Sequence, residues 1–132
     1  MATIKRFEDI LSWQKARVLN EKIGALIDNG VFKHNYRLIG QMEGSAGSIM
    51  DNISEGFERS GNKEFIQFLY IAKGSSGEFR SQLYRALDRK YITEEQFNQM
   101  YYASTEISVL IQKFIDYLHQ SEMRGIKYKK PD

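Results

Sequence analysis

Two histidines limit the metal and acid–base chemistry open to this chain. Of His34 and His119, only the second has a carboxylate at a ligand spacing, in Asp116-x-x-His119. A di-metal carboxylate site in a helical bundle needs two Glu-x-x-His pairs and two further inward glutamates. One approximate pair near a helix end does not meet that requirement. We therefore expect no metal site.

The motifs of nucleophilic and phosphate chemistry are absent from the sequence. The chain has no cysteine, which excludes disulfides, thiolate ligands, cysteine nucleophiles and haem attachment through cysteine. The phosphate-loop patterns G-x-x-x-x-G-K-[ST] and G-x-G-x-x-G are missing, as is the serine elbow G-x-S-x-G. We expect no enzyme activity and no cofactor.

The densest polar group beside apolar positions spans residues 52–57 (NISEGF). Asn52 and Glu55 are three residues apart, so they share one face of a helix. If they are buried they need partners, because an unpaired buried polar group costs about 1–3 kcal/mol. One interpretation is that they hydrogen-bond across a bundle or tie down the following turn. The alternative is a polar recognition site shared with Arg59.

Basic residues are the other candidates for a functional surface. Acids interleave most of them, so a solvated helix face is one explanation, and the net charge of +2 is mild. Contact with nucleic-acid phosphates is the alternative, because lysine and arginine release condensed counterions there. Basic residues are clustered only in the C-terminal tail, where Glu122 and Asp132 are the acidic residues. The candidates are Lys5, Arg6, Lys15, Arg17, Lys22, Arg59, Arg80, Arg85, Arg89, Lys90, and in the tail Arg124, Lys127, Lys129 and Lys130.

Four stretches of apolar residues at steps of three and four position these side chains. That spacing places each set on one face of an α-helix, and we predict helices over residues 7–28, 36–57, 63–89 and 94–121. Thr93-Glu94-Glu95-Gln96 is a capping box for the last helix. The short connections predict an all-α, antiparallel up-down-up-down four-helix bundle. We assign residues 1–121 to this domain and 122–132 to a basic tail.

Small residues are concentrated in two clusters, at residues 40–48 and 74–77. Glycine costs about 0.5–1 kcal/mol against alanine inside a helix, so the clusters need a reason. In an antiparallel hairpin they fall opposite each other, and we predict that the second and third helices cross closely there. Gly40 and Gly44 would let another backbone approach; a backbone-lined ligand site is the alternative. At the turn, Ser60 or Asn62 can cap backbone amides.

The first helix carries apolar residues over more than a narrow stripe. We expect it to contact two neighbours, or one neighbour and another subunit. No charge-free apolar run reaches the ~18 residues of a membrane span, and residues 1–13 lack the apolar core of a signal peptide. These features predict a soluble, cytoplasmic protein that makes no membrane contact.

Several segments, in this order, resemble one known family over nearly the whole chain. They are residues 7–9 (FED), 13–16 (WQKA), 52–57 (NISEGF) and 63–72 (KEFIQFLYIA), followed by Gly74-Ser75, Glu78 and Gln82-Leu83. The family is the four-helix bundle proteins encoded in intervening sequences of bacterial 23S ribosomal RNA genes. It is similar in fold to the accessory variability determinant of diversity-generating retroelements, a basic homopentamer that works with a reverse transcriptase and nucleic acid.

The resemblance implies a bundle without catalytic activity that assembles as a ring-shaped homopentamer. It also implies that Asn52, Glu55 and Gly56 are a structural motif of the family. Family members commonly have basic residues on the second helix between positions 41 and 48, where this chain has Met42, Glu43 and Gly44.

Two functions remain open. The leading hypothesis is a self-assembling bundle that binds RNA or DNA through its basic faces. The rival is a protein-interaction adaptor that binds no nucleic acid and whose partner docks on the assembled ring.

Overall fold

The protein is an all-α bundle of four long helices, as predicted. The structure, a computed structural model, describes residues 4–59 and 61–121. A 3-10 turn, η1 (Phe7–Asp9), precedes the four helices. The helices are α1 (Leu11–Asp28), α2 (Tyr36–Glu58), α3 (Asn62–Asp88) and α4 (Glu94–Gln120). Ser60 and the predicted tail at 122–132 lie outside the described residues.

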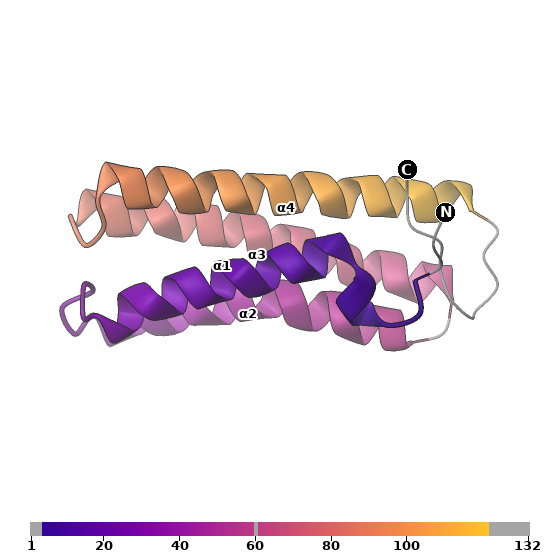
Figure 1. The fold of residues 1–132 in the computed structure, drawn as a ribbon, viewed down its shortest axis with the longest axis horizontal. Coiled ribbons are helices and arrows are strands. Elements are labelled where there is room, and N and C mark those ends of the chain that lie inside the picture. Colours follow the sequence, from indigo (N-terminus) through magenta and orange to yellow (C-terminus); the bar gives the residue numbers. More distant parts are fainter. Residues whose placement is uncertain (1–3, 60, 122–132) are drawn as a thin grey trace.

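The helices run side by side in an up-down-up-down arrangement (Figure 1). Each helix packs against its neighbours in sequence, and α1 also packs against α4, which closes the bundle. Of the two alternatives expected for the first helix, contact with two neighbouring helices is the one observed. η1 and the end of α4 lie at the same end of the bundle (Figure 1).

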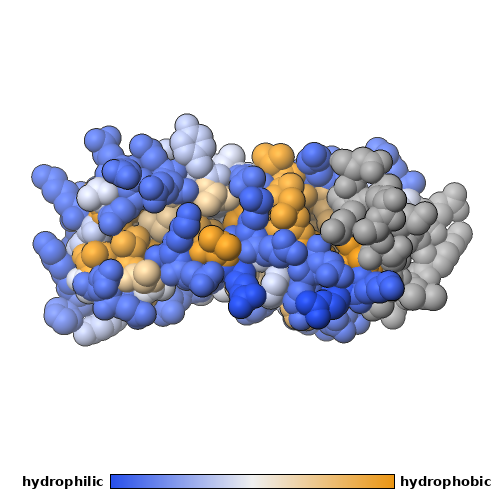
Figure 2. All heavy atoms as spheres, viewed as in Figure 1, coloured by the Kyte–Doolittle hydropathy of each residue, from blue (hydrophilic) through white to orange (hydrophobic). Residues whose placement is uncertain are grey.

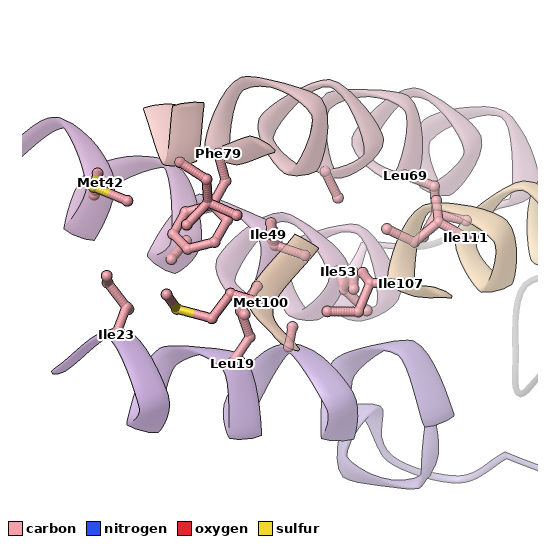
Figure 3. Packing of buried hydrophobic residues seen from close by; sticks show 14 of the residues in the cluster. Leu19, Ile23, Met42, Ile49, Ile53, Leu69, Phe79, Met100, Ile107 and Ile111 are labelled. Carbon is pink, nitrogen blue, oxygen red and sulfur yellow. The ribbon is translucent and has the colours of Figure 1, made fainter. Parts of the chain in front are cut away.

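The core is a continuous cluster of apolar side chains from all four helices. Figure 3 shows side chains that point into this interior, among them Leu19, Ile49, Phe79 and Ile107. Each of these four is fully removed from solvent. Burial of a large aliphatic or aromatic side chain contributes about 1.5–3 kcal/mol, so this shared interior is what holds the helices together.

The capping box at the start of α4 is confirmed. The Gln96 backbone N–H donates to Thr93 Oγ1 at 3.1 Å, and the Thr93 backbone N–H donates to Gln96 Oε1 at 2.9 Å. The predicted start of the first helix at residue 7 is wrong. The chain makes the 3-10 turn and then passes through Ile10 in an extended conformation. The Ile10 side chain is buried, so the chain bends here to cover the end of the core. The helix therefore does not extend back to residue 7.

The start of α3 also differs from the prediction. Asn62 is the first residue of the helix and does not cap it; the N-cap is Gly61 at φ 101°, a conformation that favours glycine. Asn62 Nδ2 donates instead to Leu118 O at 3.2 Å and to Ser121 O at 3.4 Å. The side chain therefore ties the α2–α3 turn to the end of α4.

The two clusters of small residues face each other through their serines, whereas their glycines do not. Ser48 and Ser75 share a hydrogen bond of 2.8 Å between α2 and α3. A Cβ added at Gly40 or Gly44 would meet no other atom within 4 Å, so the predicted backbone approach at these glycines is wrong. The reason is the rotation of α2 about its own axis. Because Ser45 and Ala46 face the core, Gly44 lies on the solvent side of the helix.

Candidate nucleic-acid interface

A row of serines forms a polar seam between α3 and α4. Ser76 Oγ lies 2.7 Å from Ser104 Oγ, and Ser108 Oγ donates to Ser76 Oγ at 3.0 Å. The Ser104 hydroxyl also bonds to the Ser76 carbonyl at 3.0 Å. All three side chains are buried. They occupy core-facing positions of their helices, so they must satisfy one another across the helix pair.

Arg80 inserts one nitrogen into this seam. Its Nη1 donates to Ser108 Oγ at 2.8 Å, Ser104 Oγ at 3.1 Å and Ser76 Oγ at 3.3 Å. It also donates to the Ser104 carbonyl at 3.2 Å. Every one of these acceptors is neutral. Among residues 4–59 and 61–121, no carboxylate lies in ion-pair range of Arg80.

An aromatic cluster continues the same edge toward the start of α4. The Tyr84 ring lies 4.9 Å from the Phe97 ring and 5.8 Å from the Tyr101 ring, between centroids. The Arg80 guanidinium carbon is 5.9 Å from the Tyr101 centroid, within cation–π range. Tyr84 is 50% exposed. Interaction with the neighbouring Tyr101 raises the pKa of the Tyr84 hydroxyl.

The second polar seam, between α2 and α3, accounts for Asn52. Ser45 Oγ donates to Gln82 Oε1 at 2.6 Å. Asn52 Nδ2 donates to Ser48 O at 2.8 Å and to Ser48 Oγ at 2.9 Å. Because Ser48 in turn bonds to Ser75, Asn52 is linked through it to α3.

Glu55 and Arg59 belong to a separate arrangement at the α2–α3 turn. Arg59 Nη2 lies 3.0 Å from Glu55 Oε2, and Nη1 lies 3.4 Å from Glu64 Oε2. The hydrogen bond with Glu55 raises the pKa of Arg59. The structure therefore brings Glu55 and Arg59 together across the turn. Asn52 makes its hydrogen bonds to Ser48 instead of to either of them.

The other basic candidates lie in different parts of the bundle. Arg6 pairs with Glu8 and Asp9 at 3.8 and 3.7 Å, and Lys15 pairs with Glu106 at 3.4 Å. Three more contact neutral groups: Arg17 lies over Trp13, Arg89 lies over Tyr91, and Arg85 donates to Gln41. Lys5, Lys22 and Lys90 are exposed. Arg124, Lys127, Lys129 and Lys130 fall outside the described residues.

The surface where α1 meets α4 exposes apolar side chains, and we call it the α1–α4 face. Leu11 and Val18 of α1 and Tyr102 and Val109 of α4 are between 48% and 75% exposed. Figure 2 shows hydrophobic side chains scattered among hydrophilic ones on this side of the molecule. A hollow of about 160 Å³ opens between the two helices, lined by Lys15, Val18, Leu19, Lys22, Ala103 and Glu106.

Within the described ranges, no group of three or more histidine or acidic side chains is placed to hold a metal ion. None of the helices there combines the length and the apolar character needed to cross a membrane.

Comparison with known proteins identifies the family. The model of the 23S rRNA-intervening sequence proteins matches residues 8–113. The chain belongs to this family. It is similar to the crystal structure of a protein of unknown function from the S23 ribosomal protein family of Bacteroides thetaiotaomicron. The two are 27% identical with a TM-score of 0.75, over 80% of this chain and 98% of that one. No curated protein matches the sequence.

In this member of the 23S rRNA-intervening sequence family, the segment 52–57 lies where α2 turns into α3. Gly56 is pressed against α3, because a Cβ there would lie 2.6 Å from Phe68 Cβ. The sequence did not single out Lys73, which donates to Gln112 of α4, or Tyr84, which lies against Tyr101 of α4. No local signal marks either residue, because both partners lie on the neighbouring helix.

Proposed function

We propose that this protein is a non-catalytic, self-assembling bundle that binds RNA or DNA through basic side chains on its surface. The observation that carries the nucleic-acid part is that few of the basic candidates form ion pairs. Among the described residues, ion pairs engage only Arg6, Lys15 and Arg59. The remaining candidates within the described residues keep their charge available for phosphates, whose contact with lysine and arginine releases counterions.

The α1–α4 face supports self-assembly. Leu11 and Val18 are spaced seven residues apart, as are Tyr102 and Val109, so each pair lies on one side of its helix. Large apolar side chains aligned on a face are typical of protein interfaces. The Lys15–Glu106 pair crosses the same face. A second copy of the chain is the occupant we propose, and a ring of five copies is the assembly that the family resemblance implies.

Salt-dependent binding tests the nucleic-acid part. Fluorescence anisotropy with labelled RNA and DNA, at about 50 mM and about 200 mM salt, measures the phosphate contribution. We expect binding at the lower salt concentration and a marked loss of affinity at the higher one. If neither nucleic acid binds at the lower concentration, where the phosphate attraction is strongest, this part is wrong. An assembled ring without nucleic-acid binding would favour the rival function, a protein-interaction adaptor.

A further inference from the structure

The strongest unexplained feature of the molecule is the charge on Arg80. A guanidinium in a partly buried site normally pairs with a carboxylate, because taking a charge out of water is costly. Here the side chain is partly buried and its partners are the neutral oxygens of Ser76, Ser104 and Ser108. These hydrogen bonds satisfy one nitrogen but do not neutralise the charge. The site is therefore set up to attract an anion.

The outer edge of the same guanidinium remains available. All four hydrogen bonds of Arg80 come from Nη1, although arginine carries five N–H donors. Within residues 4–59 and 61–121, no acceptor is bound by Nη2 or Nε. Gly77 lies beside this edge: a Cβ there would sit 3.7 Å from Nη2. Because glycine has no side chain, an oxyanion has space to approach.

Lys73 supplies a second cation along the same helix pair. Its Nζ donates to Gln112 Oε1 at 2.6 Å, and within the described ranges it is in no ion pair. Gln112 lies one turn beyond Ser108 on α4, so the two cations are anchored to points about 6 Å apart along the helix. The acid nearest along α4 is Asp116, which accepts from Gln112 Nε2 at 2.9 Å.

Tyr84 lies on the other side of Arg80 from Lys73. Its ring is half-exposed and is held against Phe97 and Tyr101. An exposed, immobilised aromatic ring next to cations is the combination that single-stranded nucleic acids use, because an unpaired base stacks on the ring while its phosphates meet the cations. A duplex cannot stack its paired bases in this way.

We propose that Lys73, Gly77, Arg80 and Tyr84 form a strip along α3 that binds single-stranded nucleic acid. Arg80 and Lys73 hold phosphates, Gly77 leaves room for one of them beside Nη2, and Tyr84 stacks a base. This strip rests on the proposed nucleic-acid binding and names the strand type and the residues that would carry it.

A charge placed at Gly77 tests the strip without removing Arg80. Gly77→Glu adds a carboxylate next to Nη2, where a Cβ makes only ordinary contact. Gly74→Glu is the matched control: it adds the same charge one turn away, where a Cβ would meet nothing within 4 Å. Anisotropy with a labelled oligouridylate of about 12 nucleotides should show roughly a tenfold or greater loss for Gly77→Glu and about threefold or less for Gly74→Glu. Equal losses would overturn the strip.

A second variant tests the stacking. Tyr84→Ala should weaken oligouridylate binding about tenfold and leave binding of a duplex of equal length within about twofold, because paired bases do not stack on the ring. The control is Tyr36→Ala, which removes an exposed tyrosine of α2 away from the strip and should stay within about twofold for both ligands. Circular dichroism and sedimentation confirm that each variant is folded and assembled as the parent is.

The outcomes distinguish this inference from the function on which it rests. If the unmodified protein binds no nucleic acid at low salt, both are wrong. If it binds but the strip variants match their controls, only the strip is wrong. If a poly-glutamate peptide displaces the oligonucleotide more effectively than unlabelled oligouridylate does, the strip takes an acidic peptide and our proposal is overturned.

Discussion

Gly56 of α2 lies against Phe68 of α3 so closely that a Cβ on the glycine would come within 2.6 Å of Phe68 Cβ. The Phe65 ring is the second obstacle, at 2.9 Å from the same point. Both lie on the first turns of α3, just after the chain reverses. A residue larger than glycine at position 56 would require the backbone or these aromatic side chains to shift.

Substitution of Gly56 should therefore destabilise the bundle. Gly56→Ala forces a shift of the backbone or the aromatic rings, and overpacking of this kind costs about 1–3 kcal/mol. Urea unfolding followed by circular dichroism measures the change. Gly44→Ala is the control: its Cβ has open space, and replacement of a mid-helix glycine should stabilise by about 0.5–1 kcal/mol. If both alanines stabilise equally, the close approach at Gly56 is wrong.

Loss of the Ser76 hydroxyl should weaken the α3–α4 seam. Ser76→Ala deprives Ser104, Ser108 and Arg80 of a shared partner in a buried site. We expect a loss of about 1–3 kcal/mol in the free energy of unfolding, because buried polar groups are left unpaired. Ser54→Ala, which removes a hydroxyl bound only to its own helix, should change it by about 0.5 kcal/mol or less. Equal effects of the two substitutions would count against the seam.

A charge on the α1–α4 face should block self-assembly. Val18→Glu places a carboxylate among the exposed apolar side chains of that face, where burial against a second copy would be costly. Sedimentation at micromolar concentration should show a smaller species than the parent. Ile71→Glu, on an equally exposed apolar residue of α3, should leave the mass unchanged. If the unmodified protein is itself a monomer, the proposed assembly fails.

Tyr84 should titrate at higher pH than an ordinary tyrosine. Interaction with the neighbouring Tyr101 raises its pKa, since that interaction favours the neutral hydroxyl of Tyr84. The contribution to stability is present below the ordinary value of about 10 and is lost as the pH rises through the higher folded value. NMR titration of labelled tyrosine follows the ring directly. In Tyr101→Phe the Tyr84 midpoint should move back toward the ordinary value; an unchanged midpoint would refute the assignment.

Most of the fold could be predicted from the sequence because its signals are local. The Thr93–Gln96 capping box and the apolar steps of α4 depend only on residues one turn apart, and both are as predicted. The start of α1 could not be found in this way. Glu8 and Asp9 look like the first turn of a helix, but burial of Ile10 against the rest of the bundle bends the chain there.

The candidate site was likewise predicted only where the signal is local. Charge made Arg80 a candidate in the sequence, as it did Arg85 and Arg89. In the structure the three side chains have different surroundings. Lys73 and Tyr84 were not predicted, because nothing in the sequence of α3 alone distinguishes them from other surface positions. They are distinguished only by their contacts with Gln112 and Tyr101 on the neighbouring helix.

By itself, the sequence determined the number of helices, their order and the face that each turns inward, because the 3.6-residue period fixes directions around a helix's own axis. The tertiary structure alone decided which polar side chains meet across the seams and which glycine is pressed against a neighbour. These outcomes depend on the rotation and offset of one helix relative to the next, which the packing of the whole core sets. Ser76, Arg80 and Gly56 owe their roles to that packing.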